Sequence, residues 1–466
     1  MRGLLRTRTV DPTRGPLLSS FLIFTIPIAI SSLIQVLFNA ADLAVLGAFG
    51  STLSVAAVGA TGPIVSLLVH SIVGLASGTN ILLARALGAG DRARSQRIVG
   101  TSVVMSVAVG TLFAVIGILC APAFLRLTAC DPLCSDDARL YMSIYFAAVP
   151  AVLVYNFGAS ILRVSGDSSR PLYYMLASGA LNVILNLILC VLLPQKVAAV
   201  AIATLVSQVL GAVLVLRRLS RMEGPCRLDI RHISFHMREL GNILRAGLPG
   251  AFNTALYSIS NLQIQAAINS FGPASTAGSA AAGQLEGVAS SITSSVHAAA
   301  LAFVGQNLGA NNRERVKQSL RVALLIGTLA GLVLGVGGYL IGRPLLDLFV
   351  PNDELAEQTI AFGMVRLAHI LAIYFIAGAN GVLNSATQAF GYPTLPMLNS
   401  IVTVLLFRFF WMGLVYPRLP FGADAVVNSV NLYACYPWSW SLSLLVNIGI
   451  FTVVYGRYRR GKLRAV

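Results

Sequence analysis

Two acidic residues, Asp42 and Glu286, each lie within a long apolar stretch of the sequence. A carboxylate at the centre of a membrane costs about 3 kcal/mol by insertion measurements, so an acid there is a functional candidate. Burial away from water favours the neutral form of a carboxyl group, which suits a carrier of protons. The alternative for each residue is a structural acid that is permanently protonated or paired with a cation.

The cations within apolar stretches separate these two acids. Glu286, Arg366 and Arg408 lie at similar distances from the predicted outer ends of their stretches, so a buried ion-pair cluster is a plausible structural solution. Asp42 has no cation at its depth in its own half of the chain. An unpaired acid is the better titrating group, and Asp42 is therefore the stronger candidate for ion coupling.

Polar residues also recur at helical spacing in two apolar stretches. In one they occur every four residues, at Asn253, Tyr257, Asn261, Gln265 and Asn269. In the other they are Ser31, Gln35 and Asn39, with Asp42 one turn further on. Polar stripes in lipid either bond neighbouring helices or line a cavity. We expect a substrate cavity, and its candidate residues are Gln35, Asn39, Asn253, Tyr257, Asn261, Gln265 and Glu286.

The composition places these stretches in a membrane. Of 466 residues, 56% are hydrophobic and 11% are charged, whereas a soluble domain has about a quarter charged residues. Apolar runs of about 20 residues are long enough to cross a bilayer. Twelve such spans are predicted, at 17–46, 53–84, 98–121, 139–163, 172–194, 196–217, 243–269, 278–308, 319–343, 358–387, 395–416 and 432–456.

The formal net charge of +16 is explained by the predicted membrane topology and does not indicate a nucleic-acid-binding surface. With the N-terminus inside, 26 of the 33 Lys and Arg residues fall in inner segments and only five in outer segments. This bias is the positive-inside pattern and predicts that both termini are cytoplasmic in a multi-pass plasma (inner) membrane protein. We expect membrane lipid as a partner, no nucleic acid, and a monomer.

An ordered series of matches indicates an internal repeat. Pro27 aligns with Pro249 and Asn39 with Asn261 at an offset of 222, and ALGAGDRARSQ (86–96) aligns with NLGANNRERVK (307–317) at 221. Gly166 aligns with Gly391 at 225. The predicted organisation is a six-helix half at 1–216, a cytoplasmic linker at 217–242 and a six-helix half at 243–466. Six spans per half make the repeats parallel, with a pseudo-two-fold axis along the membrane normal.

No pattern of residues indicates an enzyme, a metal site or a cofactor. No GxxxxGK[ST] motif occurs, so ATP is not expected as the energy source. Cys130 and Cys134 share a predicted outer loop, where they either pair or remain free thiols. His70, His297 and His369 lie in spans, and we expect them to pack between helices.

The sequence resembles the multidrug and toxic compound extrusion (MATE) transporters along nearly its whole length. The resemblance is carried by the first-span proline followed by NAADLAVLGAFG, by the repeated loop LGAGDRAR and LGANNRER, and by SGDSSRPLYYMLASGALNVILN followed by VAAVAIATLVSQ. It implies an antiporter in which a proton or sodium gradient drives export of small amphipathic, often cationic, organic compounds.

The resemblance also implies an ion site in the N-terminal half. In one bacterial branch this site combines a first-span Asp with polar residues of the fifth span and a sixth-span Thr, which match Asp42, Asn182, Asn186 and Thr204. Relatives often have a second Asp at the position of Asn186, and one carboxylate fewer weakens the case for sodium. The C-terminal acids of another branch are absent, since the matching seventh-span position is Tyr257.

Two other functions are possible from the sequence. A flippase for lipid-linked precursors shares the fold, but it needs a strongly cationic cavity, and only Arg366 and Arg408 are available within spans. An intramembrane enzyme needs clustered His, Asp or Cys within spans, and these are missing. The transported substrate and the choice between proton and sodium stay open at this point.

Overall fold

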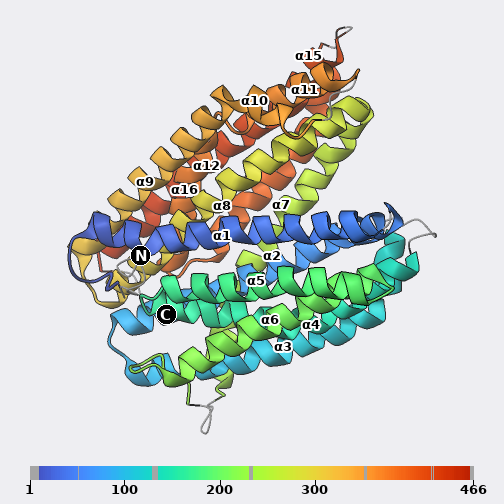
Figure 1. The fold of residues 1–466 in the computed structure, drawn as a ribbon. Helices are drawn as coiled ribbons and strands as arrows, with labels where there is room; N and C mark the ends of the chain where they lie inside the picture. The colour runs from blue at the N-terminus through green and yellow to red at the C-terminus, as the bar shows by residue number, and fades with distance from the viewer. Residues whose placement is uncertain are drawn as a thin grey trace. The chain divides into compact units, whose positions relative to one another are not determined.

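The structure, a computed structural model, describes residues 10–50, 52–127, 135–229, 235–350, 354–420, 422 and 424–461. Across these residues the chain is helical and contains no β-strand (Figure 1). The all-α fold predicted from the sequence is confirmed. Cys130 and Cys134 lie outside the described residues, so their pairing stays a prediction.

The first half of the chain contains six long helices in sequence order. They are α1 (Leu17–Phe49), α2 (Thr52–Gly88), α3 (Arg92–Leu127), α4 (Ser135–Val164), α5 (Ser169–Leu192) and α6 (Lys196–Arg221). Each extends beyond the apolar run predicted for it at one end or both, since the ends of helices are the least certain part of a prediction from sequence.

The second half contains more helical segments, because some of its spans are interrupted. Its first three helices are α7 (Met237–Ser270), α8 (Pro273–Gly309) and α9 (Arg313–Leu340). The short α10 (Gly342–Asp347) follows, and then α11 (Ala356–His369) and α12 (Tyr374–Ala389). The next span joins α13 (Thr394–Ser400), a π-helix (Ile401–Leu406), α14 (Phe407–Phe410), a second π-helix (Trp411–Val415) and a 3₁₀ turn (Tyr416–Arg418). The chain continues through α15 (Ala425–Tyr433) and α16 (Cys435–Arg459).

These helices account for the predicted spans. Within the described residues, ten helical stretches are long and apolar enough to cross a membrane, and α11 with α12, bent by 44°, makes an eleventh. The remaining predicted span is α7, which has 34 residues and is long enough to cross. Its row of asparagine and glutamine side chains makes it less apolar than the other spans.

The repeat seen in the sequence has a counterpart in the backbone. Gly90 and Asn311 occupy aligned positions, and both have a positive φ, 70° and 53°. The next residue caps the following helix in each half: the side-chain oxygens of Asp91 and Asn312 accept hydrogen bonds from backbone N–H groups three residues on, at 2.9 Å and 3.1 Å. Asparagine is the non-glycine residue that most readily adopts this conformation, which explains the exchange of Gly for Asn.

Contacts divide the chain into two compact units. Unit 1 comprises 1–15, 22–251 and 309–311, and unit 2 comprises 16–21, 252–308 and 312–466. The beginning of α7 thus belongs to unit 1, where the Arg94 side chain of α3 forms an ion pair with Glu239 at 3.5 Å. The beginning of α1 belongs to unit 2, where the rings of Phe21 and Phe303 meet edge to face at 5.2 Å.

Small residues allow helices within a unit to approach closely. In unit 1 a Cβ atom on Gly78 of α2 would lie 2.3 Å from the Ile243 carbonyl oxygen of α7. In unit 2 a Cβ atom on Gly378 of α12 would lie 2.2 Å from the Gly327 carbonyl oxygen of α9. Close backbone packing of this kind is typical of helices that associate in lipid.

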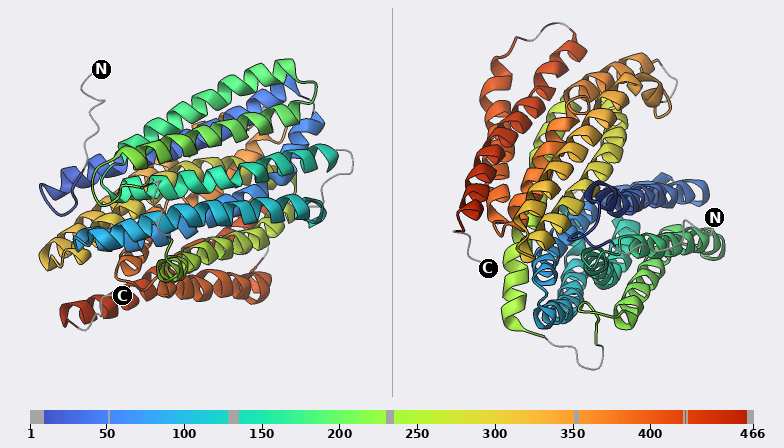
Figure 2. Two further views of the ribbon diagram at one scale, coloured as in Figure 1. Left: turned by 90° about the horizontal axis from the view of Figure 1, so that it is seen from below. Right: turned by 90° about the vertical axis from the view of Figure 1, so that its left-hand side faces the viewer.

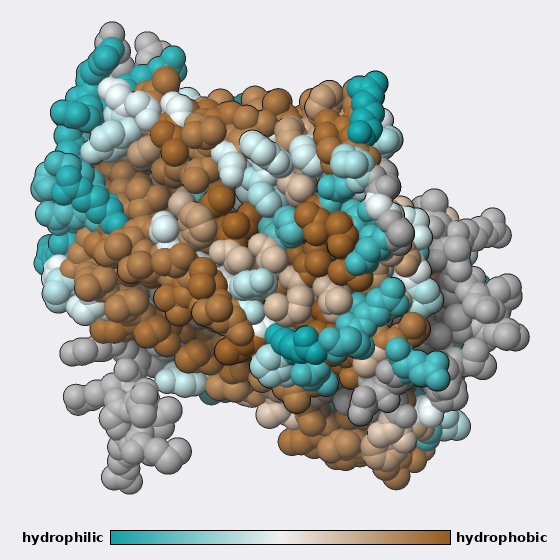
Figure 3. Space-filling model, turned by 90° about the horizontal axis from the view of Figure 1, so that it is seen from above, coloured by the Kyte–Doolittle hydropathy of each residue, from teal (hydrophilic) through white to brown (hydrophobic). Residues whose placement is uncertain are grey.

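Large apolar side chains are exposed along most of the long helices, for example Leu119, Val191, Val333 and Leu445. Figure 2 shows the long helices of each unit running alongside one another, and Figure 3 shows broad apolar areas on one face of the molecule. Exposed apolar surface of this extent is expected where the surrounding solvent is lipid.

The topology predicted from the charges is tested by labelling single cysteines. Ser270, the last residue of α7, and Asn312, the residue before α9, are exposed and lie beyond opposite ends of α8. With both termini inside, Asn312→Cys should react only with a reagent that reaches the cytoplasm, and Ser270→Cys should react from outside the cell. The native Cys226 is buried, and burial raises the pKa of its thiol to about 12, so it can be kept. The other five native cysteines are replaced, because Cys130 and Cys134 share a predicted outer loop and would react from outside. Labelling of Asn312→Cys from outside intact cells would contradict the topology.

Candidate functional site

The candidate ion site in unit 1 is centred on Asp42 of α1. Asp42 is half-buried, and the Asn186 side-chain Nδ2 of α5 donates a hydrogen bond to its Oδ1 at 2.5 Å. The Phe38 ring, one turn before Asp42, occupies the space that a side chain at Gly179 of α5 would fill. Gly179 therefore lets α1 pack closely against α5, which places Asp42 opposite Asn186.

From Asp42 a chain of neutral polar groups runs through the buried interior of unit 1. Asn186 also donates to Asn182 Oδ1 at 3.4 Å, and Asn182 donates to Thr204 Oγ1 of α6 at 3.5 Å. The Thr204 hydroxyl donates to the Val200 carbonyl oxygen at 3.0 Å. The structure therefore brings together all four residues that the resemblance proposed for the ion site.

This arrangement has the features of a cation or proton site. Asp42 forms no ion pair among the described residues, and it interacts electrostatically with the phenols of Tyr141 and Tyr145 in α4. The side-chain oxygen of Asn186 is buried and accepts no hydrogen bond within the described part of the chain. A single carboxylate surrounded by neutral oxygen atoms can hold a proton, or a small hard cation as transported cargo.

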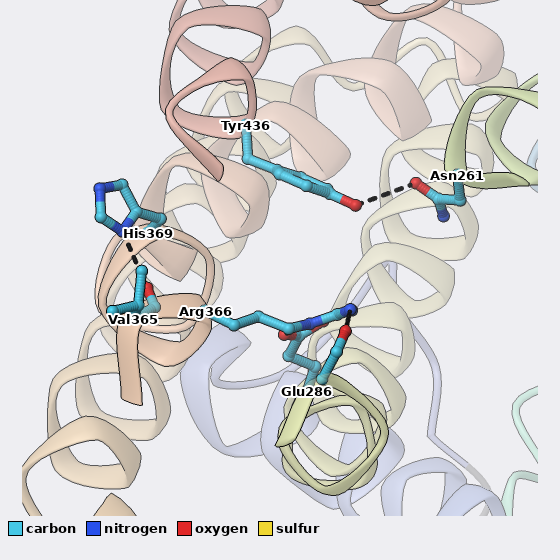
Figure 4. Close-up of polar contacts among 7 residues, drawn as sticks. Asn261, Glu286, Val365, Arg366, His369 and Tyr436 are labelled. Atoms are coloured by element: carbon cyan, nitrogen blue, oxygen red, sulfur yellow. Dashed lines mark hydrogen bonds and ion pairs between the residues drawn. The ribbon is translucent and has the colours of Figure 1, made fainter. Parts of the chain in front are cut away.

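The acid in unit 2 is in a different environment. Arg366 of α11 holds Glu286 of α8 with two parallel hydrogen bonds, Nε to Oε1 at 2.7 Å and Nη2 to Oε2 at 2.8 Å (Figure 4). The third nitrogen of Arg366, Nη1, donates to the Ser279 hydroxyl. The predicted pairing of Glu286 is confirmed, and this two-bond geometry is the strong form of an Arg–carboxylate pair.

Arg408 does not join this pair, so the predicted cluster of three charges is wrong in that respect. Arg408 Nη1 donates instead to Asn261 Oδ1 of α7 at 2.9 Å. The guanidinium carbon lies 4.2 Å from the centre of the Tyr436 ring of α16. One carboxylate accommodates one arginine in the two-bond geometry, so the second arginine is left with neutral partners.

The other candidate cavity residues fall into several settings. The Asn253 side-chain oxygen is buried without a hydrogen-bond partner among the described residues. Gln265 donates to Asn269 at 2.9 Å, which satisfies the outer end of the stripe locally. Tyr257 is half-buried in α7. Gln35 and Asn39 belong to α1 of unit 1, and the Asn39 side chain lies outside the described residues. That these residues line a substrate cavity stays a prediction.

Two histidines in spans bond to backbone carbonyl oxygens. The His297 ring of α8 contacts the Gly378 carbonyl oxygen of α12 at 3.2 Å, and the His369 ring contacts the Val365 carbonyl oxygen one turn earlier at 2.8 Å. The first contact joins two helices and the second stays within α11, so the expected packing role applies to His297. The side chain of His70 is outside the described residues.

No group of three or more His, Cys, Asp or Glu side chains suited to a metal occurs in the described part of the chain.

Sequence reasoning missed several polar residues near these sites. Tyr141 and Tyr145 near Asp42 and Tyr436 beside Arg408 were not identified, because aromatic residues in apolar spans are common and carry no distinctive spacing. Asn380, Asn399 and Asn447 were also missed. They form a buried hydrogen-bonded network with Ser443, in which Asn399 donates to the Ser443 hydroxyl at 3.1 Å.

Comparison with known proteins matches both the repeat and the fold. The MatE family model matches residues 27–188 and again 249–411. The probable multidrug resistance protein YoeA of Bacillus subtilis is 26% identical over 444 residues, covering 94% of each chain. An FAD transporter of Shewanella oneidensis is 24% identical over 333 residues, covering 69% of this chain and 72% of its own. The crystal structure of a MATE protein in the straight conformation is 20% identical with a TM-score of 0.85, covering 97% of this chain and 99% of its own.

The pairing of Glu286 predicts a structural effect of its removal. Glu286→Gln leaves the Arg366 charge, whose side chain is only 14% exposed, without a countercharge. We expect a loss of about 3 kcal/mol of stability, seen as lower membrane abundance and a lower thermal midpoint in detergent.

Glu357→Gln is the matched control for this experiment. It breaks an equally short Arg–Glu contact, from Arg343 at 2.7 Å, but there the side chains are 60% and 75% exposed. An exposed pair contributes about 0–1 kcal/mol, so the control should unfold close to the wild-type temperature. A Glu286→Gln protein with normal stability that no longer transports would show instead that Glu286 has a direct role in coupling.

Proposed function

The chain belongs to the MatE family, and from this premise we propose that it is a cation-coupled antiporter that exports small amphipathic or cationic organic compounds by alternating access. The coupling cation is a proton or sodium. The observation that carries the proposal is the setting of Asp42. Of the two acids within spans, Glu286 is neutralised by Arg366, whereas Asp42 bonds to a neutral amide.

The energetic argument concerns the charge of Asp42. An ionised carboxylate without a cation is costly within a membrane, and binding a proton or sodium removes that cost. The state of the site therefore depends on the cation, and a conformational change that buries Asp42 more deeply favours the occupied form. An inward cation gradient can then drive the outward movement of a second solute.

Asn186 can form a hydrogen bond with both the ionised and the protonated form of Asp42. Its Nδ2 donates to an ionised carboxylate, as in this structure, and the amide oxygen accepts from a protonated one after the side-chain amide turns over. The same oxygen is available to a sodium ion. Asn182 and Thr204 extend this hydrogen-bonded chain by two steps, so a change at Asp42 reaches α6 through α5.

The substrate class is a proposal that rests partly on relatives. YoeA is named as a probable multidrug resistance protein, and other relatives, such as MepA of Staphylococcus aureus, are named as multidrug export proteins. The relative from Shewanella oneidensis is named as an FAD transporter. These names support export of organic solutes, but they differ in the solute. The relatives therefore do not identify the substrate of this chain, and the feature of the chain that bears on selectivity is the polar stripe of α7.

A flippase for lipid-linked precursors is less well supported. Such a substrate carries a pyrophosphate, which needs several positive charges in the cavity. In this chain Arg366 is neutralised by Glu286, which leaves Arg408 alone among the described arginines that lie deep within the spans.

We also propose a plasma (inner) membrane location with cytoplasmic termini, a monomer in contact with lipid, and no enzymatic activity.

The test of the proposed function is Asp42→Asn. Asparagine has the size and hydrogen-bonding reach of a protonated aspartic acid, so insertion and abundance should stay near normal. It cannot release a proton or attract sodium by charge, so gradient-driven efflux of a cationic dye should fall to the level of cells that lack the protein. Efflux is measured from vesicles under an imposed pH or sodium gradient, which also identifies the coupling ion.

Three milder changes serve as comparisons. Thr204→Val and Asn182→Leu each remove hydrogen bonds but keep the charge, so they should weaken coupling less than Asp42→Asn does. Asp42→Glu keeps the titrating group one methylene away and should retain part of the efflux. Wild-type efflux by a well-expressed Asp42→Asn protein would end the case for Asp42 as the coupling residue.

A further inference from the structure

The charges within the spans of unit 2 are not balanced. Arg366 and Glu286 neutralise each other, and both oxygens of Glu286 are occupied by Arg366. Arg408 is the second arginine that lies deep within these spans, and no carboxylate contacts it in the described part of the chain. One positive charge therefore remains inside the apolar part of unit 2 without a partner of opposite charge.

The surroundings of Arg408 are polar but neutral. The residue is 1% exposed. Its Nη1 donates to Asn261 Oδ1 at 2.9 Å and to the Ser260 hydroxyl at 3.3 Å, and its Nε donates to the Ser439 hydroxyl at 3.4 Å. The Tyr436 ring lies against the guanidinium. Neutral acceptors satisfy the hydrogen bonds and the aromatic face attracts the cation, but neither supplies a negative charge.

Asn261 marks the place where a countercharge would fit. Its Oδ1 accepts hydrogen bonds from two donors, Arg408 Nη1 and, at 3.5 Å, the Tyr436 hydroxyl. Figure 4 shows the contact with Tyr436. A neutral amide oxygen thus occupies the point at which a cationic and a phenolic donor converge. Asn261 is itself an exposed residue on the polar stripe of α7, so this point lies at the surface of the unit rather than in its core.

The backbone around Arg408 is also unusual. The single α-helical turn that carries it, Phe407–Phe410, lies between two π-helical segments, Ile401–Leu406 and Trp411–Val415. π-Helical turns are rare and are found frequently at functional sites. They change which side of the helix each residue faces, and they accompany the inward placement of this long cationic side chain.

We propose that Arg408, Tyr436 and Asn261 form a binding point for the anionic group of an amphipathic ligand, a carboxylate, sulfonate or phosphate monoester. The ligand oxygen takes the place of Asn261 Oδ1 and accepts from Arg408 and Tyr436, while the Asn261 amide turns to donate. Guanidinium groups suit such anions because their fork of donors matches two oxygen atoms. This inference rests on the proposed transport function and adds an anionic class to its substrates.

Equilibrium binding to the purified protein in detergent tests the site without requiring transport. The probes are fluorescein, which is anionic, and tetramethylrhodamine methyl ester, which is cationic on the same xanthene framework. Asn261→Asp places a carboxylate beside Arg408 and should weaken fluorescein binding by at least about tenfold. It should strengthen binding of the cationic dye, because the added carboxylate leaves the site without an excess positive charge.

Asn269→Asp is the matched control. Asn269 lies in the last turn of the same helix, and its Oδ1 also accepts two hydrogen bonds, but from the neutral side chains of Gln265 and Thr276. The same added charge without an adjacent arginine should shift the ratio of the two dye affinities much less. Arg408→Lys, which keeps the charge and loses the fork, should retain part of the fluorescein binding that Arg408→Gln loses.

The outcomes separate this proposal from the proposed transport function. Opposite changes in the two dye affinities for Asn261→Asp, with little change for Asn269→Asp, support an anion site at Arg408. Equal loss of both dyes, an unchanged ratio, or absence of fluorescein binding to the wild-type protein would overturn it. The coupling role of Asp42 is tested by gradient-driven efflux of a cationic dye, and none of these binding results bears on it.

Discussion

A charge within the apolar interior of a membrane must be paired, neutralised or solvated, because the surrounding hydrocarbon offers it no stabilisation. Among the described residues, four charged side chains lie deep in the spans, and only two of them meet this constraint by pairing. Glu286 and Arg366 pair, with two hydrogen bonds between them. Asp42 contacts a neutral amide and Arg408 contacts neutral oxygens. The unpaired groups are where a transported cation and a ligand anion would be stabilised.

The internal repeat supplies a common backbone on which the halves differ in chemistry. Gly166 and Gly391 are aligned and have φ values of 91° and 88°, so the same turn is kept in both halves. The residue aligned with Asp42 is Ile264, which is fully buried in an apolar cluster with Ile268, Ile370 and Leu432. The first position holds a carboxylate among polar neighbours and the second packs in a core. The repeat therefore preserves the framework and not the ion site.

The sequence predicted the helical fold and the repeat, because apolar length and aligned turns can be read along one chain. For Glu286 it offered pairing as one of two possibilities and left the partner open between Arg366 and Arg408. The resemblance named Asp42, Asn182, Asn186 and Thr204, and the structure places them in one hydrogen-bonded chain. The partner of Arg408 could not be predicted, since Asn261, Ser260 and Ser439 come from helices far apart in sequence. Nor could the π-helical turns, which depend on packing rather than on residue spacing.

The central claim is that Asp42 links cation binding to ligand binding. Its most direct test is the affinity of the purified protein for a cationic dye, measured over a range of pH and of sodium concentration. In the wild-type protein the affinity should fall as the coupling cation becomes more available, because in an antiporter the cation-bound and dye-bound states exclude each other. In Asp42→Asn the affinity should be independent of that cation. An unchanged dependence in the Asp42→Asn protein would contradict the account.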